Sequence, residues 1–547
     1  MQKISRYYHT IKPLKSEQIL YRLKYRFFPV KALPTPSSED LSANRWSLNA
    51  PQVGVQSLFE NDEVCFLNKR AQIKAPQDWN DDAQHAMLWL YNLHYFDDLN
   101  SSGADQRYRL QKKFILKWIE ENPPLHGNGW DPYPLSLRLV NWVKWCQFNQ
   151  EYDVDILRSI EQQADALMAQ LEFHILGNHL FANAKALVFV GCFLKGGRAD
   201  DYSTKGLQLL TREVSEQFLA DGGHFELSPM YHSILLWDLI DLYNLALVSK
   251  DVRFSSFHPE WKEVIERGLS WLSVMCHPDG DISFFNDAAF GIAPSPNEIF
   301  RFALSVGITT DNKTGPSITM LQDSGYSRLK RGPFTLIFDH AEVGPTYLPG
   351  HAHADTLSIE LSLGRQRVFV NSGTSEYGTE PERQRQRSTA AHNTLFVKSQ
   401  NSSDVWAGFR VGKRAHVSGV ESEETNDAVM VRAEHDGFCH LVKGLTHTRK
   451  CTVFDNKVLI EDELGVSGTK PIIAHFHLHP DVDVETIDTH SVRLILASGE
   501  TLLFTADEPV SVEKTTWHPE FGKSISSLRL VIVISGSYLT SELTLGS

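Results

Sequence analysis

The chain has 547 residues, of which 42% are hydrophobic and 22% charged, and its formal net charge is −14 at pH 7. This composition is typical of an ordinary globular protein of several domains. The acidic balance argues against general nucleic-acid binding, although a polyanionic substrate stays compatible with it if basic residues gather locally. Aromatic residues make up 11% of the chain, including 12 tryptophans, which favours clefts that stack against sugar rings.

The cysteines and the N-terminus bear on the cellular compartment. The six cysteines are scattered, without a C-x-x-C motif, and most have apolar neighbours, as does Cys192. They indicate buried thiols in a reducing compartment. The first residues lack the apolar core of a secretory signal, and no apolar run is long enough to span a membrane. We therefore expect a cytoplasmic protein without a transmembrane segment, with a periplasmic location as the alternative; the sequence does not indicate the oligomeric state.

Residues 1–60 are predicted to form an N-terminal extension that packs on the body of the protein. Within it, Ser16 to Phe28 has the pattern of a basic amphipathic helix. Such a helix suits docking to a membrane surface as well as packing on the body, and we expect the packing.

Residues 61–314 are predicted to form a repeating helical array. Glycine-bearing turns recur roughly every 45–60 residues, a spacing that suits helical hairpins. Three runs suited to buried helices alternate with amphipathic segments such as Asp155 to Phe173 and Trp261 to Val274. The three buried runs are Leu135 to Trp145, Ala182 to Phe193 and Ile234 to Leu247. This alternation predicts two concentric layers of helices, an incomplete α/α toroid.

In such a ring, the turns before the inner helices gather on one face. We therefore expect a single cleft lined by polar residues from these turns, although each residue alone also suits a cap, an ion pair or packing. The residues are Asn178, His179, His224, Glu226, Tyr231 and His232. Trp130, Tyr377 and Trp406 are candidates for stacking against or contacting sugar rings.

Residues 315–547 change to a period of two, which predicts strands. Segments such as Phe334 to Phe338, Lys457 to Asp462 and Leu528 to Ile534 are separated by Gly, Asn and Asp turns. Many strands with few helical patterns predict an antiparallel β-sandwich. The border between the two domains is placed near residues 312–316.

Histidine and arginine motifs mark the second half. His351 and His353 lie two apart in Gly350-His-Ala-His-Ala-Asp355, and would point to one side of an extended segment. Histidine both moves protons near neutral pH and binds metals, but two hydrogen-bonded strand histidines are the structural alternative.

Arg383, Arg385 and Arg387 alternate along the chain, and their forked side chains suit carboxylate or sulfate groups unless they form a solvated edge. His475, His477 and His479 are expected to be ordinary sheet residues rather than a metal site.

The order of these motifs resembles the heparinase II/III-like polysaccharide lyases, which include alginate lyases and combine a toroid with a sandwich. The resemblance rests on four segments that follow in order. They are Gly177-Asn178-His179, Glu226-Leu-Ser-Pro-Met-Tyr231-His232, Gly350 to Asp355, and Ala391-His392-Asn393-Thr394.

The resemblance implies cleavage of a uronate-containing polysaccharide by β-elimination. Asn178 and His179 would bind the uronate carboxylate, and His351 would act as the base or assist Tyr231. Tyr231 would act as the acid, or, for one uronate stereochemistry, as both base and acid. In the fold that the resemblance implies, Glu226, His232, Arg383 and Arg387 would contact the substrate, an acidic polysaccharide or oligosaccharide.

No cofactor is implied for the reaction, but relatives hold a structural zinc ion. The resemblance places His353 and His392 at two of its ligand positions. The third position, an aspartate in relatives, is Asn371 in this sequence, and an amide oxygen is a poorer zinc ligand than a carboxylate.

Two other functions stay open beside the lyase. A uronyl C5-epimerase removes the same proton with the same groups, and a non-catalytic glycan-binding or assembly protein could retain the fold. A role in capsule or exopolysaccharide metabolism would suit the expected cytoplasmic location.

Overall fold

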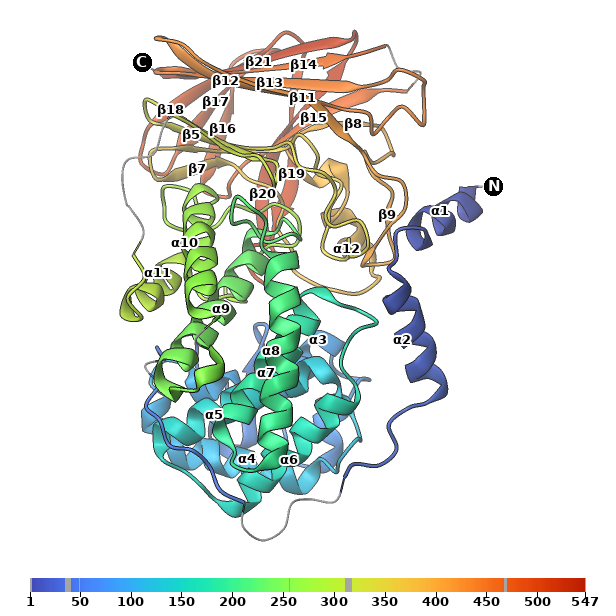
Figure 1. Cartoon of the computed structure of the whole chain (residues 1–547). Coiled ribbons are helices and arrows are strands. Elements are labelled where there is room, and N and C mark those ends of the chain that lie inside the picture. The colour runs from blue at the N-terminus through green and yellow to red at the C-terminus, as the bar shows by residue number, and fades with distance from the viewer. Residues whose placement is uncertain are drawn as a thin grey trace.

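The structure is a computed structural model that describes residues 2–34, 41–48, 50–254, 256–309, 317–466 and 470–546. A helical domain and a β domain stack on one another, and two N-terminal helices lie along one flank (Figure 1). The predicted architecture, a toroid followed by an antiparallel sandwich, is confirmed. The predicted border at residues 312–316 lies outside the described residues.

The helical domain consists of α-helices joined by short turns, with a small hairpin at its start. The hairpin strands are β1 (Glu63–Phe66) and β2 (Lys69–Gln72). The helices are α3 (Met87–Tyr95), α4 (Tyr108–Glu121), α5 (Pro132–Asn149), α6 (Val154–Ala169), α7 (Gly177–Phe193), α8 (Gly197–Gln217), α9 (Pro229–Ser249), α10 (His258–Val274) and α11 (Pro296–Ser305).

Helices α5, α7 and α9 form the inner layer. Their apolar residues surround each helix, so that nearly every residue of α7 and most residues of α5 and α9 are buried. Helices α6, α8 and α10 instead bury one face and expose the other. The three predicted inner runs coincide with α5, α7 and α9, because a helix that is apolar all round must be covered on all sides.

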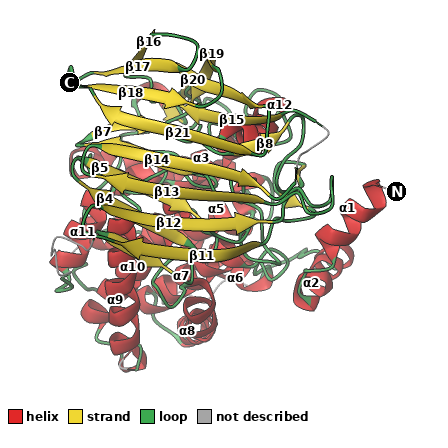
Figure 2. Cartoon of the chain, turned by 90° about the horizontal axis from the view of Figure 1, so that it is seen from above, coloured by secondary structure: helices red, strands yellow, loops and turns green. Residues whose placement is uncertain are grey.

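The β domain contains three antiparallel sheets that share one apolar core. An eight-stranded sheet has the order β11-β12-β13-β14-β21-β18-β17-β16 and covers the top of the molecule (Figure 2). Its strands are β11 (Val417–Glu424), β12 (Ala428–His435), β13 (His447–Phe454), β14 (Lys457–Leu464), β16 (Val482–Thr486), β17 (Ser491–Leu496), β18 (Thr501–Ala506) and β21 (Tyr538–Leu545).

The two smaller sheets lie between this sheet and the helices. The five-stranded sheet comprises β3 (Ile318–Leu321), β4 (Tyr326–Arg331), β5 (Phe334–Asp339), β6 (Ile359–Leu363) and β7 (Gln366–Phe369). The four-stranded sheet comprises β19 (Val510–Trp517), β20 (Ile525–Ile534), β15 (Ile472–His477) and β8 (Leu395–Val397). A short pair, β9 (Val405–Trp406) and β10 (Arg410–Val411), and the helix α12 (Pro381–Gln386) lie in loops that face the helical domain.

The N-terminal helices are α1 (Gln2–Ile11) and α2 (Ser16–Phe27). Helix α1 contacts the β domain through Arg6 and Asp404, whereas α2 contacts the helical domain through Tyr25, whose hydroxyl donates to the Leu171 carbonyl over 2.6 Å. The extension therefore bridges both domains. None of the described helices is long and apolar enough to cross a membrane.

Candidate active site

The candidate site lies where the helical domain meets the loops of the β domain. Tyr231 comes from the first turn of α9, whose N-cap is Ser228; the Ser228 hydroxyl accepts from the Tyr231 amide over 3.2 Å. His351 comes from the loop before β6, not from a strand. The extended geometry predicted for His351 and His353 is therefore wrong, although both residues are at the site.

The rings of Tyr231 and His351 stack on each other. Their centroids are 3.8 Å apart and their planes differ by 15°. On its other side, His351 is hydrogen-bonded through Nδ1 to the buried Glu226 carboxylate. Burial alone would raise the pKa of Glu226, but His351 outweighs it and the pKa lies below the usual value. An ionised Glu226 fixes the His351 proton on Nδ1 and leaves Nε2 as the basic nitrogen.

Tyr231 is a neutral phenol with a second tyrosine as its partner. Its hydroxyl lies 2.9 Å from the hydroxyl of Tyr377, which also lies beside His351. Burial, together with the neighbouring Tyr377, raises the pKa of Tyr231 well above its usual value. Tyr231 therefore holds its proton at neutral pH and can donate it.

Asn178 and His179 form the first turn of α7. His179 Nδ1 lies 2.9 Å from Glu172 Oε1, and the His179 ring packs on Tyr133 at 4.3 Å between centroids. Burial lowers the pKa of His179, but the Glu172 carboxylate more than offsets this and the pKa is raised. His179 retains a quarter of its side-chain surface, and its raised pKa favours the cationic form that an anion would bind.

The first turn of α7 is close to residues 340–358 of the β domain, the loop between β5 and β6 that carries His351 and His353 and is here called the histidine loop. Gly177 has φ +58°, and a Cβ added there would lie 2.3 Å from Leu348 Cδ2 and 3.5 Å from Glu226 Oε1. Only a residue without a side chain allows this approach. Asn178, His179, Glu226, Tyr231 and His351 therefore lie in one region, as the ring of inner helices predicts.

The prediction that Arg383 and Arg387 contact the substrate is wrong, because both side chains are fully buried and already bonded. Arg383 pairs with the buried Asp287 through both of its terminal nitrogens and lies over the Tyr377 ring at 4.9 Å. Arg387 donates to the Ala352 carbonyl over 2.8 Å. These arginines hold Tyr377 and the histidine loop in place.

The predictions for His232 and Trp130 are corrected in the same way, whereas that for Trp406, which is partly exposed, stays a prediction. His232 is buried and its Nε2 lies 3.0 Å from the Gly268 carbonyl. Trp130 is buried in the helical core, where its Nε1 donates to Asn122. Trp406 packs against Tyr7 of α1 at 5.3 Å.

Of the remaining candidates, Tyr377 contacts Tyr231, whereas Glu226 binds His351 instead of facing a sugar. Phe409, three residues after Trp406, packs edge-on against both His351 and Tyr377. Buried His224 contacts Gln217 at 3.1 Å and supports the turn before α9.

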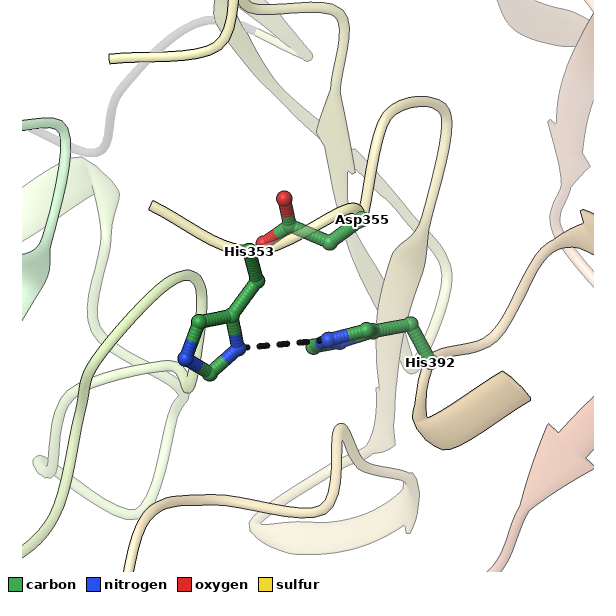
Figure 3. Close-up of side chains that lie close together, drawn as sticks. All are labelled: His353, Asp355 and His392. Atoms are coloured by element: carbon green, nitrogen blue, oxygen red, sulfur yellow. Dashed lines mark hydrogen bonds between the residues drawn. The ribbon is translucent and has the colours of Figure 1, made fainter. Parts of the chain in front are cut away.

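A group of metal-binding side chains lies behind this site. His353, Asp355 and His392 are buried, and one ligand atom from each lies within 4.8 Å of the others (Figure 3). His353 Nδ1 is 3.2 Å from His392 Nε2, and His353 Nε2 is 2.8 Å from Asp287. Burial lowers the pKa of His353 to about 4 and that of His392 to about 3, so both are neutral and suited to a metal.

The side chain of Asn371 makes other hydrogen bonds, and its assignment as a metal ligand stays a prediction. Its amide oxygen accepts from the Asn393 amide over 3.2 Å, and its amide nitrogen lies 3.5 Å from Ser358 Oγ. Asp355 supplies the carboxylate that Asn371 lacks. Two histidines and a carboxylate, with Asp287 orienting His353, make a donor set that fits zinc.

Comparison with known proteins agrees with this geometry. The protein-family model described as heparinase II/III N-terminus matches residues 70–301. The family model described as heparinase II/III-like, C-terminal, matches residues 313–544. The chain belongs to the heparinase II/III-like family.

Relatives of this heparinase II/III-like protein have names that describe lyases. A heparin-sulfate lyase of Bacteroides stercoris is 23% identical over 435 residues, which cover 69% of this chain and 61% of the relative. A heparin-sulfate lyase of Pedobacter heparinus is 24% identical, over 58% of this chain and 49% of the relative. The chain thus spans about half to three fifths of the length of these curated relatives.

Solved structures share the fold. The crystal structure of heparinase III matches with a TM-score of 0.68 and 17% identity, over 97% of this chain and 90% of that chain. A chondroitin AC lyase of Streptomyces coelicolor matches with a TM-score of 0.52 and 10% identity, over 85% of this chain and 75% of that chain.

Three residues of this heparinase II/III-like site are absent from the sequence-based prediction. They are Glu172, which binds His179, Asp287, which binds Arg383 and His353, and Asp355 as a metal donor. Asp287 does carry a signal, because it is a charged residue within the apolar run Phe284 to Phe290. Buried charges in such runs are paired or bind metals.

Proposed function

We propose that this protein is a polysaccharide lyase that cleaves an acidic, uronate-containing polysaccharide by β-elimination. The observation that carries the proposal is the stacked pair of Tyr231 and His351, with Glu226 fixing the histidine tautomer. Family membership and the names of the relatives support it.

The first step is to bind the uronate carboxylate. The C5 proton is weakly acidic because its loss adds charge to an existing anion. The protonated His179, held by Glu172, and the adjacent Asn178 amide can donate to this carboxylate and stabilise the enolate-like state.

The second step is elimination. The C5 proton passes to His351 Nε2, the C4–C5 double bond forms, and the C4–O bond breaks. The Tyr231 hydroxyl gives its proton to the departing oxygen. The Glu226 carboxylate stabilises the resulting imidazolium. Transfer of that proton from His351 to the Tyr231 phenolate restores both groups.

The test is a panel of uronate polymers that includes heparan sulfate and chondroitin sulfate, which the relatives' names suggest. The wild-type protein should generate the ultraviolet absorbance of an unsaturated uronate on at least one polymer. Tyr231→Phe should lower kcat by about 10²–10⁴ without changing the thermal unfolding temperature. Turnover without that absorbance would favour the epimerase, and binding without turnover would favour the glycan-binding protein.

We also propose that His353, Asp355 and His392 hold a structural zinc ion. The ion would fix the loops that carry His351 and His392, and the elimination uses only side chains. Metal analysis of the purified protein should find zinc that is lost in His392→Ala, with a lower unfolding temperature. Retention of zinc in that variant would contradict the assignment. The cytoplasmic location and the role in capsule or exopolysaccharide metabolism stay predictions.

A further inference from the structure

The two N-terminal helices expose apolar side chains that the body of the protein leaves uncovered. In α1, Ile4 is 76% exposed, and in α2, Phe27 is 66% exposed. Further exposed apolar residues from the same segment are Tyr7, Tyr8, Ile11, Ile19, Leu20, Leu23 and Phe28. Isolated exposed apolar residues are common, but a series along two consecutive helices marks an interaction surface.

Helix α2 attaches to the body with a face of mixed polarity, on which Tyr21 packs against Phe173 at 4.6 Å between ring centroids. Gln18 is buried and its amide donates to the Ile175 carbonyl over 3.2 Å; Arg22 donates to the His174 carbonyl over 3.3 Å. At 100° per residue, Leu23 and Phe27 point away from these contacts. The helix packs on the body as expected, but Leu20, Leu23 and Phe27 face outward.

Helix α1 shows the same orientation. Thr10 accepts from the Trp406 indole over 3.2 Å, and Arg6 pairs with Asp404. Ile4, Tyr8 and Ile11 recur at the helical spacing on the opposite side. Both helices lie along the same flank in the two views (Figures 1 and 2).

The flank is strongly basic in an acidic protein. Residues 2–34 contain eight lysines and arginines and one glutamate, whereas the whole chain has a net charge of −14. Lys12, Lys24, Arg26 and Lys31 are exposed. The basic and apolar side chains therefore share one surface.

We propose that this flank docks on an anionic lipid surface. Exposed aromatic and aliphatic side chains bordered by lysine and arginine suit the boundary between headgroups and acyl chains, and anionic lipids attract the basic residues. The acidic remainder of the chain would be repelled, which orients the molecule with this flank towards the lipid. A symmetric dimer through the same flank would instead place two basic segments against each other.

The flank formed by α1 and α2 contacts the loop that carries His351. Gln18 donates to the Tyr347 carbonyl over 3.4 Å, and Lys15 lies over the Tyr347 ring at 3.9 Å. Tyr347 lies four residues before His351. Docking would therefore hold the cleft next to the lipid surface. The docking itself does not depend on the proposed lyase activity.

The test is flotation of the full chain with vesicles of phosphatidylcholine alone, or of three parts phosphatidylcholine to one part phosphatidylglycerol. The wild-type chain should bind the second and not the first, and added salt should weaken the binding. Leu20→Glu/Leu23→Glu/Phe27→Glu should weaken it by about tenfold or more. Lys24→Glu/Arg26→Glu should have a similar effect, about tenfold.

A matched control places three glutamates at exposed apolar positions elsewhere, Phe148→Glu/Leu304→Glu/Val533→Glu, and should bind like the wild type. All variants should keep the wild-type unfolding temperature, since the changed side chains are exposed. No binding to either vesicle, equal binding to both, or unchanged binding of both α2 variants would overturn the proposal. A dimer in sedimentation that the α2 variants disrupt, without vesicle binding, would assign the flank to a second copy of the chain.

Discussion

Burial determines the roles of the two aromatic side chains at the centre of the site. The raised pKa of Tyr231 keeps its proton available for the leaving group, and Glu226 directs the basic nitrogen of His351 outward. Tyrosine is protonated at neutral pH in any environment, whereas the choice of the basic nitrogen of His351 depends on its neighbour Glu226.

A pH dependence follows from the pair of His179 and Glu172. In the proposed mechanism the uronate carboxylate binds to protonated His179, so kcat/KM should fall as the pH rises through the pKa of His179. Glu172 raises that pKa, and Glu172→Gln should therefore move the alkaline limb of the profile to lower pH. Pre-steady-state or initial-rate profiles of both proteins measure the shift.

The control for this prediction is Glu151→Gln. Glu151 binds Lys112 and Tyr108 at the outer end of α5, remote from His179. Its profile should match the wild type. An unchanged alkaline limb in Glu172→Gln would show that His179 does not bind the substrate as a cation.

Residue identities were predictable where the chemistry demands a particular side chain. The structure brings together four of the predicted residues, Tyr231, His351, Asn178 and His179. Each of them lies in the first turn of an inner helix or in the loop before β6. Arg383 was assigned to the substrate because its partner Asp287, 96 residues away, is not visible in the sequence. A forked donor suits an internal carboxylate as well as one on a ligand.

Among the elements, a buried hydrogen-bond network in the β domain supports the loops that carry His351 and His392. Arg449 on β13 donates to the Leu357 carbonyl over 2.9 Å and to the Asn393 carbonyl. It is itself held by Asp462 on β14, through two bonds of 2.8 and 2.9 Å. The loop with His351 and the loop with His392 are thus fixed to the same strand pair.

Removal of this arginine should be strongly destabilising. Arg449→Met leaves Asp462 buried and without its guanidinium partner, which should cost about 3–5 kcal/mol in the free energy of unfolding. Chemical denaturation followed by tryptophan fluorescence measures the loss.

The neighbouring Lys450→Met is the matched control. Lys450 is partly exposed and pairs with Glu461 at 2.8 Å across the same two strands. An exposed ion pair contributes about 0–1 kcal/mol, so this change should be nearly neutral. Equal effects of the two substitutions would contradict the role assigned to the buried network.

The elements themselves were largely predictable from periodicity. The apolar runs of α5, α7 and α9 and the alternation in β5, β14 and β20 identify their structures. The alternating arginines of residues 383–387 did not indicate a helix, although Pro381 follows Glu380 as at a helix start. Because side chains two apart on a helix diverge, Arg385 turns to Glu382 instead of joining Arg383.

At the scale of the whole molecule, the site exists because two domains meet. Tyr231 belongs to the helical domain and His351 to the β domain, and Gly177 of α7 touches Leu348 in the histidine loop. The sequence indicated both domains and their order. The sequence could not indicate which residues form the contact between the two domains, because those side chains have no shared periodic pattern.

The contact at Gly177 should be sensitive to one added methyl group. Gly177→Ala places a Cβ against Leu348 and should displace the loop that carries His351, lowering kcat by more than the loss of stability explains. Kinetics and thermal unfolding of the same preparation separate the two effects.

Gly196→Ala is the control, since Gly196 also has a positive φ, +117°, but has no neighbour within 4 Å of an added Cβ. Backbone strain alone should cost about 1–3 kcal/mol there and leave kcat unchanged. Equal kinetic effects of the two alanines would mean that the interface tolerates the added methyl group.

In the proposed reaction, proton removal from C5 by His351 is coupled to loss of the C4 oxygen. Turnover of a uronate polymer in D₂O, followed by mass spectrometry and NMR of products and recovered polymer, measures this coupling directly. We expect fragments with a C4–C5 double bond and no deuterium at C5 of the recovered polymer. Deuterium at C5 in an uncleaved polymer would contradict it and identify an epimerase.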